Sequence, residues 1–190
     1  MRKAFLVAIL LFGAVAPGLA APDGNPPGTG WTPDQNVLGY VEQSDKLTKL
    51  LALLKAADLS SKLRGKGPIT LLAPTDDAFA GMPPEMLQSL QLPEHKAQLV
   101  QILGCHIIAG RIKIDGLKLA SQSKRAIHLR SITGCKSTAV FDGEQLTIND
   151  ENGIKAKLIF SDVGEANGIV QVIDGVLTPS IASIKSKGQK

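Results

Sequence analysis

The chain has 190 residues, and no segment after the first twenty is long and apolar enough to span a membrane. Its 21 Lys and Arg against 17 Asp and Glu give a formal net charge of +4 at pH 7. These basic residues are dispersed along the sequence, whereas nucleic-acid binding needs them clustered, so we expect no nucleic-acid partner.

The first twenty residues have the three parts of a secretory signal peptide, in order. A basic start at Arg2 and Lys3 precedes an apolar stretch from Ala4 to Val15, and small residues follow at Gly18-Leu19-Ala20. The apolar stretch is shorter than the roughly 20 residues of a bilayer-spanning helix. We therefore expect residues 1–20 to be removed and the mature protein to be secreted, periplasmic or at the cell surface. Cleavage would leave 19 basic against 17 acidic residues, a weak balance of +2.

The remaining chain divides into a leader, one domain and a tail. Residues 21–35 are rich in Pro, Gly, Asn and Asp and predict a flexible leader, with Trp31 as the only large apolar side chain. Residues 181–190 consist mainly of Lys, Ser and Gly and predict a flexible tail. Residues 36–180 have the length of a single domain with one core.

The first half of the domain predicts helices around one short strand. Ser44 is expected to cap a helix whose Leu47, Leu50, Leu51 and Leu54 share one face, and residues 58–63 predict a short helix or turn. Residues 69–72 form an apolar run between two prolines, which favours a strand. Further short helices are predicted after Thr75, from Pro83-Pro84 to Leu90, and after Pro93, where Leu99, Ile102 and Leu103 supply the apolar stripe.

The second half changes to the period of strands. Short β-prone segments at residues 137–141, 145–148 and 154–160 are separated by Asp142-Gly143 and residues 149–153, which are hairpin connections. Residues 169–173 are almost entirely apolar and predict a central strand. Helices followed by a β-meander predict an α+β domain.

Three stretches of the domain, in order, resemble the fasciclin (FAS1) family. Residues 69–79 resemble its first sequence box and residues 167–179 its second. Residues 99–110, which include His106, resemble its central Tyr-His segment, although Cys105 stands at the tyrosine position. The resemblance implies a compact β-sandwich or wedge with helices packed over one side. It also implies extracellular or cell-surface work in adhesion.

We interpret the residues of these boxes as mainly structural. The first box reads as a buried strand, a proline-stopped turn and a capped helix, and the second as a central strand between two turns. For the histidine we expect a buried imidazole bonded to backbone or hydroxyl groups, the alternative being that it shapes an adhesion surface. The motif residues are Thr70, Ala73, Pro74, Thr75, Phe79, His106, Asn167, Gly168, Asp174 and Gly175. The chain has no good match to the Asp-Ile motifs linked to integrin binding in animal members, which argues against integrin adhesion.

Cys105 and Cys135 are the two cysteines of a chain that we expect to leave the reducing cytoplasm. A disulfide is the natural interpretation, and two buried thiols are the alternative. The bridge would close a loop of about 30 residues, which is worth on the order of 3 to 4 kcal/mol in the chain-entropy model. The pair also resembles bacterial family members, which implies the same bridge.

A search for catalytic or metal-binding patterns gives no candidate. If Cys105 and His106 lie in an extended segment, their side chains point to opposite faces and cannot form a thiol–imidazole pair. His95, His106 and His128 are too scattered for a zinc site, and residues 149–153 lack the spacing of a calcium loop and predict a hairpin turn. We expect no enzyme activity, no metal and no cofactor.

Two functions remain open. The first is a secreted adhesion or interaction module that binds an extracellular protein, a polysaccharide or another copy of itself. The alternative is a carrier of an apolar small molecule such as a carotenoid, as some family members are. The abundance of Leu, Ile and Val does not discriminate between them, because core packing also needs these residues. The sequence names no ligand-binding residue.

Overall fold

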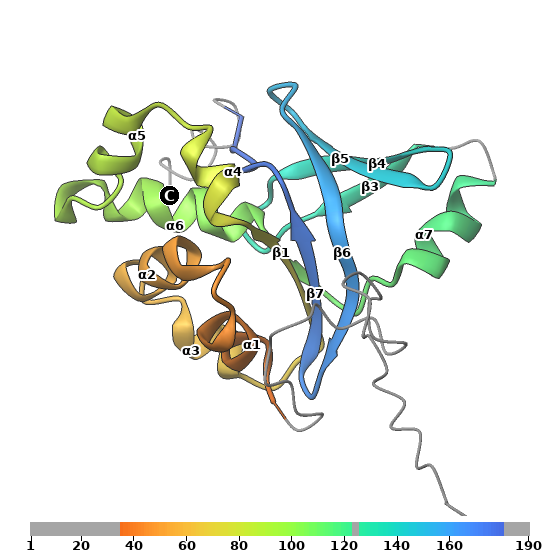
Figure 1. The fold of residues 1–190 in the computed structure, drawn as a ribbon, viewed down its shortest axis with the longest axis horizontal. Coiled ribbons are helices and arrows are strands. Elements are labelled where there is room, and N and C mark those ends of the chain that lie inside the picture. The colour runs from red at the N-terminus through yellow and green to blue at the C-terminus, as the bar shows by residue number, and fades with distance from the viewer. Residues whose placement is uncertain (1–34, 123–125, 181–190) are drawn as a thin grey trace, which may run out of the picture.

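The computed structural model describes residues 35–122 and 126–180, and Figure 1 shows their arrangement. The predicted signal peptide and tail, and all of the predicted leader except Gln35, lie outside the described residues. Within the described part, no helix combines the length and the apolar character needed to cross a membrane.

A layer of short helices covers one side of a curved sheet (Figure 1). It comprises α1 (Val37–Gln43), α2 (Thr48–Ala56), α3 (Ser60–Arg64), α4 (Asp76–Ala80), α5 (Pro84–Ser89), the 3-10 turn η1 (Pro93–His95) and α6 (Lys96–Cys105). A further helix, α7 (Ile114–Ser121), lies apart from this layer beside β3 and β4. The helices expected between residues 47 and 105 are therefore present, and the sequence patterns did not predict α1 or α7.

The start of α2 differs from the sequence prediction. Ser44 does not cap this helix but ends α1, and its hydroxyl accepts a hydrogen bond from the Lys46 N–H at 3.4 Å. The carboxylate of Asp76 caps α2 instead of Ser44. It accepts hydrogen bonds from the Thr48 hydroxyl at 2.5 Å and from the Lys49 N–H at 2.8 Å. The prediction was wrong because local sequence cannot reveal a cap that comes from a distant segment.

Seven strands of the described chain form one sheet in the order β2-β1-β7-β6-β5-β4-β3. β7 runs parallel to β1 and antiparallel to β6, and all other neighbours are antiparallel. Their bounds are β1 (Ile69–Pro74), β2 (Ile107–Ala109), β3 (Ile127–Arg130), β4 (Lys136–Asp142), β5 (Gln145–Asp150), β6 (Lys155–Glu165) and β7 (Gly168–Ile173). The predicted meander and the central position of β7 are confirmed, and β2 and β3 were not predicted.

The two edges of the sheet approach each other and nearly close it into a barrel. A β-bridge joins Ile108 of β2 to Ser131 just after β3, and the Ile132 N–H donates to the Ile107 carbonyl at 2.9 Å. β6 shifts register against β7 on both sides of Phe160, which bends the long strand between the two halves of the sheet.

Two apolar clusters result from this shape. Alternate residues of β1 and β7, such as Leu71 and Val172, pack against the helix layer, where Leu50, Leu54 and Phe79 are buried. Their neighbours along the strands join a second cluster inside the curved sheet, with residues such as Leu72, Ile148 and Ile173. Because β7 faces a core on both sides, each of its residues is buried. The predicted α+β fold, a wedge with helices packed over one side, is confirmed.

Candidate functional site

The two sequence boxes lie side by side in the sheet. β1 pairs with β7 along its whole length, from Ile69 opposite Gly168 to Pro74 opposite Ile173. Just beyond the pair, the Thr75 N–H donates to the Ile173 carbonyl at 3.1 Å. Residues about 100 positions apart in the sequence therefore form one unit at the centre of the fold.

The two threonine side chains of the first box bond to backbone groups. The Thr70 hydroxyl donates to the Gly110 carbonyl at 2.7 Å and accepts from the Ile112 N–H at 2.9 Å, which fixes the turn after β2. The Thr75 hydroxyl accepts from the Ala78 N–H at 3.2 Å and caps α4, as its sequence position predicts. These two hydroxyls therefore secure connections between elements.

The apolar motif residues of the first box are Ala73, Pro74 and Phe79, and all three are buried. Ala73 is fully buried against the helix layer, and Phe79 is 2% exposed in the same cluster. Pro74 ends β1, so the chain leaves the sheet before α4 begins. Their positions match a role in packing.

Asn167, at the start of the second box, ties three segments together. Its side-chain oxygen accepts from the Val37 N–H at 2.9 Å, and its amide nitrogen donates to the carbonyls of Leu63 and Gly65 at 2.8 and 2.7 Å. A β-carbon on the adjacent Gly168 would lie 2.3 Å from the Ile69 carbonyl oxygen. This position therefore requires glycine, because any side chain would push β1 and β7 apart.

The end of the second box makes a close turn against β6. The Asp174 carboxylate accepts from the Lys157 N–H at 2.6 Å, and the Asp174 N–H donates to the Lys157 carbonyl at 3.0 Å. A β-carbon on Gly175 would lie 3.0 Å from the Ala156 β-carbon. The turn thus continues the pairing of the chain with β6 after β7 has ended.

His106 is completely buried and uses both ring nitrogens. Nδ1 lies 2.9 Å from the Ile102 carbonyl, and the Leu177 N–H donates to Nε2 at 2.9 Å. Because a carbonyl only accepts and an amide N–H only donates, the proton of the neutral ring sits on Nδ1. Burial lowers the pKa of His106 to about 4, since a charged imidazole would lose its hydration. The ring is therefore neutral at pH 7 and links α6 to the second box.

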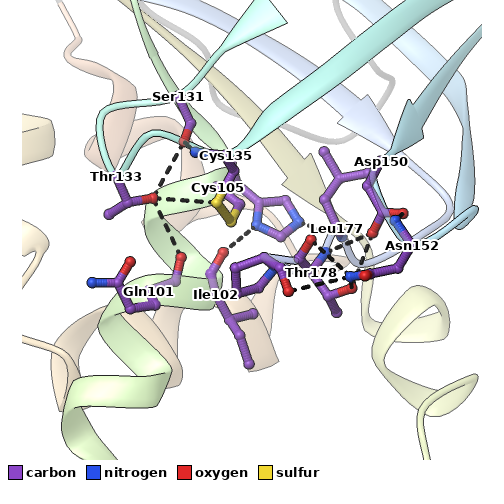
Figure 2. Close-up of a disulfide and its surroundings, with 12 residues drawn as sticks. Gln101, Ile102, Cys105, Ser131, Thr133, Cys135, Asp150, Asn152, Leu177 and Thr178 are labelled. Carbon is purple, nitrogen blue, oxygen red and sulfur yellow. Dashed lines mark hydrogen bonds between the residues drawn. A yellow bond between two sulfur atoms is a disulfide. The ribbon is translucent and has the colours of Figure 1, made fainter. Parts of the chain in front are cut away.

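A disulfide joins Cys105 to Cys135 beside this histidine (Figure 2). Cys105 is the last residue of α6, and His106 continues with αR backbone angles, so the extended geometry assumed for this pair is wrong. Cys105 and His106 still cannot form a thiol–imidazole pair, because the Cys105 sulfur is held in the disulfide. Thr133 lies against the bridge, with its hydroxyl 3.5 Å from the Cys135 sulfur.

The turn between β5 and β6 also holds the second box, which sequence reasoning missed. The Asp150 carboxylate accepts from the Thr178 N–H and hydroxyl at 2.9 and 3.0 Å, and from the Asn152 and Ile154 N–H groups at 2.9 and 2.8 Å. Asn152 donates to the Thr178 hydroxyl at 2.7 Å. The sequence signal was the Asp-x-Asn-Gly turn itself, which predicted the hairpin but not its distant partner.

Among the described residues, open depressions lie on the surface and an apolar hollow lies inside the curved sheet. An open depression of about 560 Å³ is lined by residues that include Arg64, Lys66, Arg111 and Asn167. The Arg64 guanidinium pairs with Glu42, Arg111 donates to two backbone carbonyls, and the Asn167 amide is bonded as described above. The depression therefore offers a ligand little beyond the Lys66 ammonium.

The hollow inside the curved sheet is apolar. Leu72, Ile108, Leu117 and Leu146 contribute to its lining, and it has room for about 10 Å³ of solvent. Pockets that hold drug-sized ligands measure roughly 300 to 1,000 Å³. This cavity therefore does not favour the carrier alternative, which stays a prediction.

The fold and the arrangement of the boxes define a class of protein. Residues 45–179 match the family model of the fasciclin domain. The fold resembles the solved FAS1 domain pair of the insect cell adhesion molecule fasciclin I, with a TM-score of 0.70 and 19% identity over 80% of this chain and 53% of that one.

Relatives with higher sequence identity occur in bacteria and animals. The chain is 37% identical to protein sll1483 of Synechocystis sp., over 72% of this chain and 69% of that protein. It is 30% identical to the transforming growth factor-beta-induced protein ig-h3 of Sus scrofa, over 80% of this chain but only 20% of that protein. The chain belongs to the fasciclin (FAS1) family.

Proposed function

We propose that this FAS1 domain is an exported adhesion or interaction module that works through its surface and has no catalytic activity. One observation carries the proposal: the polar motif residues bond through their side chains to backbone groups inside the domain. They are Thr70, Thr75, His106, Asn167 and Asp174. Motif residues engaged in this way maintain the scaffold, and contact with a partner falls to the exposed surface.

The family membership supports a role in adhesion. Fasciclin I, which shares the fold, is a cell adhesion molecule, and FAS1 domains are in general non-enzymatic. We extend this role to the present chain, with a cell-surface or matrix component or a second copy as its partner. The integrin-type adhesion of animal members is not included, because the chain lacks a good match to the associated motifs.

Export is the second part of the proposal. A signal peptide over residues 1–20 predicts a mature protein that starts at Ala21, with a FAS1 domain over residues 36–180. Amino-terminal sequencing of the protein recovered from the periplasm or medium should begin at Ala21. Recovery of the uncleaved chain from the cytoplasm would contradict export.

The adhesion role is tested with cells. Fluorescently labelled mature protein should bind saturably to cells or matrix of the source organism, and a deletion strain should attach or aggregate less than the parent strain. Complementation with the intact gene provides the control. Unchanged attachment, together with no saturable binding, would contradict the proposal.

A further inference from the structure

The outward side of strands β3 to β6 collects basic side chains that are dispersed in the sequence. We call this side the basic face and define it by its four cations, Arg130, Lys136, Lys155 and Lys157, all exposed. Arg130 lies directly opposite Lys136, while Lys155 and Lys157 occupy alternate positions of β6. Residues two apart on a strand point to the same side, so all four cations share one surface.

The opposite side of the same strands fixes this orientation. Leu129, Ala139, Ile148 and Ala156 point inward and are buried in the second apolar cluster. A shift of one residue in register would bury the cations and expose these apolar side chains, which makes the arrangement stable. The basic face is therefore a fixed feature of the fold.

The four cations have no acidic partner among the described residues. The ion pairs found there are Arg64–Glu42, Lys96–Asp58 and Lys118–Glu144, and none of them includes a cation of the basic face. Two carboxylates adjoin the outward side: Asp142 at the far end of β4, and Asp174, which follows β7 and accepts from the Lys157 N–H at 2.6 Å. The surface therefore keeps an excess of positive charge.

The pairing of Arg130 with Lys136 is costly for the fold. Like charges directly opposite each other destabilise an antiparallel pair, and both side chains are exposed without a described counter-charge. Two like charges placed opposite each other, with no counter-charge inside the domain, indicate that a partner outside the domain uses this surface. An anionic partner would supply the missing charge.

The side chains between the cations indicate the kind of anion. Thr138 and Thr147 place hydroxyl groups on the same side, whereas the Gln145 amide nitrogen bonds to the Leu146 and Leu158 carbonyls. The outward positions of these four strands between residues 127 and 157 hold no Phe, Tyr or Trp, and His128 is the one aromatic ring there on which a single-stranded base could stack. Cations mixed with neutral donors and acceptors suit a chain that carries acidic groups and hydroxyls together.

We propose that the basic face binds an acidic polysaccharide whose chain carries carboxylate or sulfate groups beside free hydroxyls. The proposal rests on the adhesion function above and names the partner chemistry and the surface for it. Charge complementarity selects the acidic chain, and the neutral side chains pair with the sugar hydroxyls. The convex outer side of the strands offers an extended surface in place of a pocket.

The test measures binding of the mature protein to immobilised polygalacturonate and dextran sulfate, which separate carboxylate from sulfate recognition. We expect saturable binding to at least one, weakening as salt is raised, and none to neutral dextran. Duplex DNA and phosphatidylglycerol vesicles are measured in parallel. No binding to either polysaccharide, or binding to DNA or vesicles that is equal or tighter, would overturn the proposal.

A pair of matched variants locates the site. Lys136→Glu/Lys155→Glu reverses two charges of the basic face, and Lys46→Glu/Lys66→Glu reverses two exposed charges on the helix side with the same change in net charge. We expect the first to weaken binding at least about tenfold and the second by less than about twofold. Equal losses would overturn the assignment to this face. Circular dichroism confirms that both variants are folded.

A failure of the polysaccharide proposal can be distinguished from a failure of the proposed adhesion function. If Lys136→Glu/Lys155→Glu binds source cells as well as the wild type does, the polysaccharide proposal is wrong and adhesion stands. The wild type could instead bind neither cells nor matrix but still bind polygalacturonate through Lys136 and Lys155. In that case the proposed adhesion function is wrong, and the assignment of polysaccharide binding to the basic face is kept.

Discussion

The two halves of the sheet use their side chains in opposite ways. β1 and β7, which carry the family boxes, face a core on both sides, and polar residues such as Asn167 bond to the backbone around them. β3 to β5 and the first residues of β6 carry neither box and cover a core on one side only, so their other side meets solvent with Lys136 and Lys155 exposed. From this difference we propose that the motif residues maintain the scaffold and that the surface available to a partner lies in the other half.

Loss of the covalent link has the largest expected effect on the scaffold. Cys105→Ala/Cys135→Ala should lower the free energy of unfolding by about 3 to 4 kcal/mol, because the open chain gains loop entropy when it unfolds. Urea titration measures the difference, and wild type unfolded with a reducing agent serves as the control. A loss below about 1 kcal/mol would show that the bridge adds little to the scaffold.

Low pH should lower the free energy of unfolding of the domain, because the imidazole of His106 is protonated more readily in the unfolded chain. The folded-state pKa of about 4 lies below the ordinary 6.5, so the unfolded chain takes up the proton first. The stabilisation by the neutral ring is complete above pH 6.5 and is lost as the pH falls towards 4, an effect on the order of 3 kcal/mol. Unfolding at pH 7 and pH 4.5 measures it, with His106→Gln as the comparison.

The comparison with His106→Gln removes the contribution of other titrating groups. The glutamine side chain has a donor and an acceptor but no ionisable group in this range. The variant should therefore lose less stability than the wild type between the two pH values. Identical losses would show that His106 does not cause the acid sensitivity.

A matched pair of asparagine variants separates the two halves. Asn167→Ala should cost about 2 to 3 kcal/mol, because it leaves the Val37 N–H and the Leu63 and Gly65 carbonyls without their partner. Asn149→Ala, on the outward side of β5, should change stability by less than about 1 kcal/mol. Thermal unfolding of both variants checks the prediction, and equal costs would remove the distinction between the halves.

The smallest stability change is expected on the basic face, and its direction is informative. Lys136→Glu places opposite charges across from each other at Arg130, so stability should stay the same or rise by about 0.2 to 1 kcal/mol. Urea titration at low and moderate salt detects the change, since salt should reduce any gain. A clear loss of stability would show that Lys136 supports the fold.

Much of the scaffold could be predicted from the sequence because its determinants are local. The apolar run of residues 169–173, the cap at Thr75 and the Asp142-Gly143 turn each act within a few residues. The cap supplied by Asp76 to α2 could not be predicted, since donor and acceptor come from segments 27 residues apart. The hydrogen bond from the Thr178 N–H to the Asp150 carboxylate could not be predicted for the same reason.

The basic face could not be predicted from the sequence for a related reason. Arg130, Lys136 and Lys155 are dispersed along the chain, so the sequence does not show that they lie on one surface. Only the strand register, with Arg130 opposite Lys136 and Lys155 two strands away, assembles them on one side. Charge clustering in a sheet depends on pairing between strands, which a run of residues does not display.

The most direct test of the division between scaffold and surface measures stability and polysaccharide affinity on the same two variants, under conditions where both are folded. The account predicts that Asn167→Ala loses about 2 to 3 kcal/mol of stability but keeps its affinity for the acidic polysaccharide. It predicts the reverse for Lys136→Glu/Lys155→Glu, which should keep its stability and lose affinity at least about tenfold. If folded Asn167→Ala loses affinity as the charge-reversal variant does, the boxes take part in binding and the division is contradicted.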